Sequence, residues 1–142
     1  MTKRYGTTAI VYAVIAMVCG VFFREFTKYR AFEGSTRLSV MHTHYFILGM
    51  MFFLVLMLLE KNFSFSSQKG AGIFPVTYQI GLNITGIGFF MRGLIQVLQK
   101  EPGRGLDASI SGIAGIGHII MSVSLVLLLL KIKKAAALSE IR

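Results

Sequence analysis

The sequence predicts an all-α integral membrane protein with four transmembrane helices, and three observations support this fold class. The chain of 142 residues is 54% hydrophobic and only 15% charged, and its mean hydropathy is +0.68, which is unusual for a soluble domain of this size. Four apolar runs each reach the roughly 20 residues that a helix needs to cross the hydrocarbon core. The runs are continuous, whereas the strands of a transmembrane β-barrel alternate between apolar and polar residues.

The four predicted spans are Thr7–Phe26, Leu38–Leu59, Ile73–Leu98 and Ala108–Ile132. Short polar connections separate them, so the helices should alternate in direction and form an up-down bundle or an open arc. Pro75 suits the first turn of the third helix, and Asp107 or Ser109 is expected to cap the fourth. The whole chain, residues 1–142, is therefore expected to form one transmembrane domain in which the second and fourth helices are parallel.

The net charge of +9 comes from basic residues at the ends of the apolar runs. No basic patch is interleaved with aromatic residues, so membrane-flanking charge explains it better than nucleic-acid binding. With both termini in the cytoplasm, that side carries eight Lys and Arg residues, Arg142 among them, against seven on the other side. This small excess favours a multi-pass protein of the bacterial inner (cytoplasmic) membrane with cytoplasmic termini.

All three histidines of the chain lie inside apolar runs. His42 and His44 stand near the start of the second span, and His118 lies within the fourth. A histidine within a membrane is costly without a partner, so each one indicates a functional site. Residues two apart on a helix are separated by about 200° around its axis, so His42 and His44 should face opposite ways. The parallel directions of the two helices place all three histidines in the same half of the bilayer.

Haem is the ligand that this pattern favours. Two neutral imidazoles from facing helices form a six-coordinate b-type centre, and we assign them to His44 and His118, between the second and fourth helices. His42 is then a ligand of a second haem or an oligomer contact. Gly112 and Gly115 are expected to share a face with His118 and to make room for the porphyrin, although small residues in membrane helices are more often packing surfaces.

Other polar residues in or beside the spans have candidate roles. Four arginines near the same membrane surface are candidates for pairing with haem propionates: Arg24, Arg92, Arg37 and Arg104. Snorkelling to the interface explains Arg24 and Arg92 at least equally well. Gln79 and Asn83, in the third span, are expected to form hydrogen bonds between helices.

The segment His42-Thr43-His44-Tyr45-Phe46-Ile47-Leu48-Gly49-Met50 resembles the tenth helix of haem–copper oxidase subunit I. In that family an H-x-H-Y pair puts one histidine on each of two haems. The resemblance implies that His42 matches the ligand of the high-spin haem and His44 that of the low-spin haem. His118 and the residues after it loosely resemble the family's other low-spin ligand segment. The oxidase copper site needs three further histidines and a cross-linked tyrosine, which this chain lacks, so oxygen reduction is not implied.

The same resemblance bears on assembly. The oxidase subunit arranges twelve helices as three arcs of four, so a chain that resembles one arc implies a homotrimer with haem held between neighbouring protomers. The overall pattern also resembles small four-span membrane proteins of bacteria. The resemblance to the oxidase covers only a small part of the chain and specifies no redox partner.

Two alternatives to haem stay open. One is a copper or zinc site built from the three histidines, which requires an irregular start of the second helix so that His42 and His44 converge. The other is a structural, pore-forming or accessory subunit without a cofactor. No acidic residue lies in the core of a span, so no catalytic acid–base pair is evident and enzymatic activity stays open. The expected role is electron transfer, haem sensing or haem handling.

Overall fold

The computed structural model describes residues 1–139, so Arg142, counted above, lies outside them. All regular structure within residues 1–139 is helical: α1 (Thr2–Tyr29), α2 (Leu38–His44), η1 (Tyr45–Met51), α3 (Phe52–Phe63), η2 (Phe65–Ser67), α4 (Ile73–Val97) and α5 (Arg104–Ser139). Because α2, η1 and α3 are continuous, four helices are long and apolar enough to cross a membrane. The predicted all-helical fold with four helices of membrane-spanning length and hydropathy is thus confirmed, and each predicted span lies within one helix, apart from Leu98, which caps α4.

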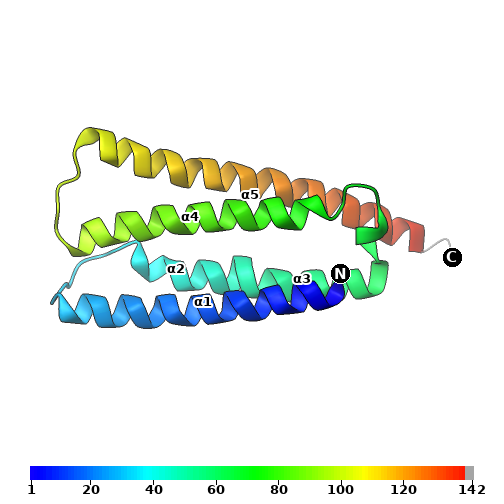
Figure 1. Cartoon of the computed structure of the whole chain (residues 1–142), viewed down its shortest axis with the longest axis horizontal. Helices are drawn as coiled ribbons and strands as arrows, with labels where there is room; N and C mark the ends of the chain where they lie inside the picture. The colour runs from blue at the N-terminus through cyan, green and yellow to red at the C-terminus, as the bar shows by residue number, and fades with distance from the viewer. Residues whose placement is uncertain (140–142) are drawn as a thin grey trace.

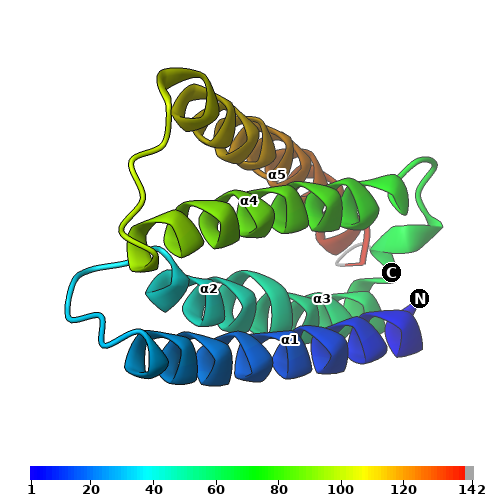
Figure 2. The same ribbon diagram turned by 60° about the vertical axis from the view of Figure 1, so that its left-hand side comes forward.

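The helices follow one another in a row and alternate in direction (Figures 1 and 2). α1 packs against the α2–η1–α3 helix, α2 and η1 pack against α4, and the most extensive contact in the fold joins α4 to α5. One end of the row, here called the histidine end, carries the connections 30–37 and 98–103. The opposite end, here called the terminal end, carries the start of α1, the end of α5 and the connection 64–72.

Glycine lets α4 and α5 touch through their backbones. A Cβ atom on Gly81 would lie 2.6 Å from the Met121 nitrogen, and one on Gly117 would lie 2.7 Å from the Thr85 nitrogen. Such close approach is how membrane helices gain van der Waals contact, since lipid tails leave no hydrophobic driving force between helices.

The wider helical turn of η1 is tied to α4 by a tyrosine. In this π-helical segment the Leu48 carbonyl accepts a hydrogen bond of 2.9 Å from the Tyr78 hydroxyl. Tyr12 of α1 stacks on Tyr45 with ring centroids 5.8 Å apart, and a Cβ atom on Gly49 would lie 2.6 Å from the Tyr12 ring. The irregular turn is therefore held from both sides by packed aromatic residues.

Two of the local expectations need correction. α5 begins at Arg104, so neither Asp107 nor Ser109 is its cap; the Asp107 side chain forms an ion pair with Arg92 instead. Gln79 does not reach another helix, because its Nε2 donates to the Pro75 carbonyl of the same helix at 3.2 Å. Asn83 behaves as expected, since its Nδ2 donates to the Tyr12 hydroxyl of α1.

Gly117→Ala should lower the stability of the protein by about 1–3 kcal/mol, because the added methyl group meets backbone atoms of α4 that cannot move aside without separating the helices. Thermal unfolding in detergent, followed by circular dichroism, measures the change. Gly20→Ala is the matched control: its Cβ would meet only His42 at an ordinary distance of 3.7 Å. Equal melting temperatures for the two variants would contradict the backbone-contact account.

Candidate functional site

Two histidines from different helices contact the same phenylalanine of α4. The His44 ring meets Phe89 edge-on, with centroids 4.8 Å apart and an interplanar angle of 83°. The His118 ring of α5 meets Phe89 at 5.9 Å and 64°. α4 contacts both α2 and α5, and Phe89 is the residue of α4 that touches both imidazoles.

The two imidazoles are oriented in the same way by their own helices. Nδ1 of His44 lies 3.1 Å from the Val40 carbonyl, and Nδ1 of His118 lies 2.8 Å from the Ala114 carbonyl. A carbonyl oxygen only accepts, so Nδ1 carries the proton in the neutral ring, and Nε2 keeps its lone pair. In a metal-binding histidine, a hydrogen bond at the ring nitrogen that does not bind the metal fixes the tautomer and the orientation of the ring. The Nδ1 bonds of His44 and His118 have this form.

His42 faces the other way. Its side chain packs against α1, where a Cβ on Gly20 would lie 3.7 Å from the His42 Cβ. Its Nδ1 is buried and has no hydrogen-bond partner among the described residues. The opposite orientations predicted for His42 and His44 are therefore confirmed. Within residues 1–139, no three His, Cys, Asp or Glu side chains lie close enough together to hold a metal ion, so this geometry does not favour a site made of all three histidines.

A groove of about 330 Å³ opens beside His118 at the histidine end. It is lined by Arg37, Gly88, Phe89, Arg92, Ile110, Ser111, Ala114 and His118. The volume is in the range of small-molecule sites, and the lining combines apolar side chains with a few polar groups, as such sites do. We call it the histidine-end groove.

The two arginines of this groove differ in their bonding. Arg92 is held by α5: it forms an ion pair with Asp107 and donates to the Ser111 hydroxyl at 2.8 Å. Arg37 begins the second span, and its backbone nitrogen donates to the Gln96 side chain at 2.8 Å. The Arg37 side chain is in no ion pair with the described residues. The groove therefore has one cation already neutralised and one available.

The remaining predicted site residues lie away from the groove. The Arg24 side chain is 80% exposed, with its Nε 3.9 Å from Glu25. Gly112 and Gly115 lie on an exposed face of α5, and a Cβ on either would meet no atom within 4 Å. They do not line the groove beside His118; Ser111 and Ala114 take that place. Sequence reasoning missed Phe89 and Ala114, because only the rotation of each helix about its axis reveals them.

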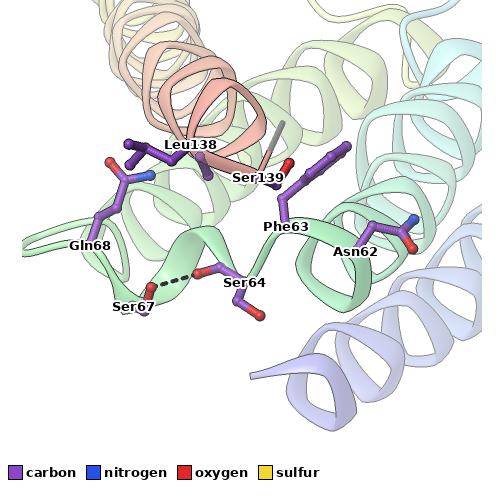
Figure 3. A pocket seen from close by; sticks show the side chains of 8 residues that line it. Asn62, Phe63, Ser64, Ser67, Gln68, Leu138 and Ser139 are labelled. Carbon is purple, nitrogen blue, oxygen red and sulfur yellow. Dashed lines mark hydrogen bonds between the residues drawn. The ribbon is translucent and has the colours of Figure 1, made fainter. Parts of the chain in front are cut away.

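A second pocket, of about 320 Å³, lies at the terminal end and is shown in Figure 3. Its lining comes from the end of α3, the residues around η2 and the end of α5: Asn62, Phe63, Ser64, Ser67, Gln68, Ala135, Leu138 and Ser139. The Ser67 hydroxyl donates to the Ser64 carbonyl at 2.8 Å. None of the lining residues is titratable or a preferred metal ligand, so the histidine-end groove is the stronger candidate.

Residues 1–135 match the model of a family described as "Protein of unknown function (DUF2871)". The chain belongs to this family. The DUF2871 match extends from α1 into the last turns of α5, so it includes the three histidines, Phe89 and both arginines of the groove. We found no match among curated proteins or among solved structures.

Arg92→Gln should destabilise the protein by about 1 kcal/mol, because it removes the charged partner of Asp107 and one of the ties between α4 and the start of α5. The value is modest since the Asp107 side chain is half exposed. Thermal unfolding in detergent measures it, with Arg24→Gln as the control at an exposed arginine. If both variants and the unmodified protein have the same melting temperature, Arg92 has no structural role in joining the helices.

Proposed function

We propose that this protein binds b-type haem in the membrane through His44 and His118, and that it acts in electron transfer, haem sensing or haem handling. One observation supports the proposal most. Imidazoles from two helices that are not adjacent in sequence contact the same Phe89 ring, and each has its Nε2 free for iron. Neutral imidazole is the usual axial ligand of b-type haem, and bis-histidine ligation gives a low-spin centre.

The chemistry around the two histidines suits haem, but the crevice beside His44 is closed and would have to open to admit it. Apolar and small side chains surround His44 (Met41, Leu82, Thr85 and Gly86) in a narrow crevice. Arg37 and Arg92 lie near His118, where their charge would suit propionate groups. Phe89 contacts both imidazoles, so ligation by both within one chain requires this ring to move aside and the side chains packed around His44 to give way.

The charge distribution and the oxidase resemblance bear on the orientation and the assembly of the protein. The slight excess of basic residues on the side of the termini supports cytoplasmic termini in a bacterial inner membrane. The resemblance to the oxidase arc supports a homotrimer. The contact of His42 with α1 of its own chain favours a structural role over ligation of a second haem. Copper or zinc, and a structural or pore-forming subunit without cofactor, are the alternatives that the first test separates.

Haem binding is tested by optical spectra of the purified protein, oxidised and reduced with dithionite, after reconstitution with haem b. The unmodified chain should give a Soret band and sharp reduced α and β bands, and His44→Ala and His118→Ala should each lose the low-spin signature. His42→Ala is the matched control and should keep it. A complete lack of haem spectra overturns the proposal; bound copper or zinc by elemental analysis would then support the metal alternative.

Phe89→Ala should increase the rate of haem uptake several-fold, because it removes the ring that packs against both imidazoles and opens space beside them. Stopped-flow growth of the Soret band measures the rate. Phe74→Ala is the control, since Phe74 is also half-buried on α4 but lies at the terminal end. Slower uptake in the Phe89 variant alone would mean that the ring supports the haem and does not obstruct it.

A further inference from the structure

α5 exposes a continuous stripe that no other helix of the chain covers. The stripe, here called the α5 seam, consists of Gly105, Ala108, Gly112, Gly115, Ile119, Ser122, Val126 and Leu129, all exposed. Alternating spacings of three and four residues align side chains along the contact line of two packed helices. Most residues in the first half of the seam are small, which allows another helix to approach closely. Gly117, by contrast, is already packed against α4.

A second uncovered surface lies between α1 and α4, on the other side of the row. This α1–α4 groove, of about 240 Å³, is lined by Thr7, Thr8, Val11, Tyr12, Ile15, Gln79 and Asn83. Asn83 is exposed in the single chain although it lies in the middle of α4. The side-chain oxygens of Gln79 and Asn83 accept no hydrogen bond from the described residues. An amide oxygen that accepts no hydrogen bond at membrane depth is costly. We therefore expect a hydrogen-bond donor from another molecule to pack against this surface.

The depths of the two surfaces in the membrane correspond. Three contacts set the register of α5 on α4: Ser124 with Thr77, Met121 with Gly81, and Ala114 with Gly88. In this register of the antiparallel helices, Ser122 is level with Gln79 and Ile119 is level with Asn83. The Ser122 hydroxyl makes no hydrogen bond with the described residues and is exposed. A donor on the seam is thus level with an unpaired acceptor in the groove.

The shapes of the two surfaces also correspond toward the histidine end. The same register places Gly112 level with Phe90. Phe90 contacts Phe22 of α1, with ring centroids 5.7 Å apart, and both rings are partly exposed. Together they form a ridge above the α1–α4 groove. Gly112 has no side chain, so it leaves space on the α5 seam at the same depth as this ridge.

We propose that the α5 seam of one protomer packs into the α1–α4 groove of a second copy of this chain. Copies related by an axis along the membrane normal keep each residue at the same depth, so Ser122 meets Gln79 and Gly112 meets the Phe22–Phe90 ridge. The two contacting surfaces are different, so the interface is head-to-tail, and the proposed assembly is the closed ring that its repetition about this axis forms. The proposal does not depend on haem, and its tests require none.

The first test is the oligomeric state of Gly115→Leu in lipid nanodiscs, measured by native mass spectrometry. No atom of the protomer lies within 4 Å of the added Cβ, so the helical content and fold should persist while the ring is lost. Gly103→Leu is the control, because Gly103 is equally open but precedes α5 and lies off the seam. An unmodified chain that is monomeric, or a Gly115→Leu variant that keeps its full oligomeric state, overturns the proposal.

The second test locates the interface by disulfide cross-linking. Cys19 is the only cysteine of the chain, so Cys19→Ala gives a background without thiols. Ser122→Cys combined with Gln79→Cys should cross-link protomers under mild oxidation, and Val123→Cys with Gln79→Cys should not, since Val123 is exposed on a neighbouring face. Cross-linking of Ser122→Cys alone would indicate a two-fold contact between α5 helices and would overturn the proposed groove.

Discussion

The backbone contact of α4 with its neighbours is the constraint on which the structure depends. Membrane helices gain little from apolar burial against one another, so close approach and interhelical hydrogen bonds must hold them. α4 supplies both. Gly81 and Gly88 admit α5, and Gly93 admits Leu38 at the start of α2. The Gly93 carbonyl also accepts a hydrogen bond from the Thr36 hydroxyl, so the same residue both admits and fixes the second span.

This packing brings the histidines together. α5 packs on the side of α4 that carries Gly81 and Gly88, and α2 packs on an adjacent side that carries Gly93, so the residue that follows Gly88 in the sequence lies where both partners reach it. That residue is Phe89, and its ring meets both His44 and His118. Within residues 1–139, His44 and His118 make no hydrogen bond to another helix, and the Nδ1 of each bonds within its own helix. The site is therefore a product of helix packing and not a cause of it.

Much of the fold could be predicted from the sequence, because a long apolar run has one stable state in a bilayer. The opposite orientations of His42 and His44 follow from the helical repeat alone. The rotation of each helix about its own axis could not be predicted: α5 is apolar on nearly all sides, so its sequence does not distinguish Gly117, which packs on α4, from Gly112 and Gly115, which are open. That ambiguity explains why Gly112 and Gly115 were expected beside the candidate haem, whereas Ser111 and Ala114 line the groove at His118.

Interactions between residues distant in sequence account for the other differences. Asp107 is a residue type that often caps helices, yet its carboxylate pairs with Arg92 of α4 and α5 already begins at Arg104. The π-helical turn of η1 depends on a tyrosine thirty residues away that bonds the Leu48 carbonyl. Neither is visible in local sequence, since both depend on which side chains the packed helices bring together.

The proposed ring and the proposed haem site are physically connected, although they are tested apart. His118 precedes Ile119 of the α5 seam, so a neighbouring protomer packed on the seam borders the histidine-end groove. That neighbour would replace lipid along one side of the groove and enclose a surface that the single chain leaves open. In a more enclosed site the charge of Arg37, which has no ion-pair partner among the described residues, acts with less screening. Enclosure would therefore strengthen the attraction for an anionic group such as a propionate without any change in the ligands.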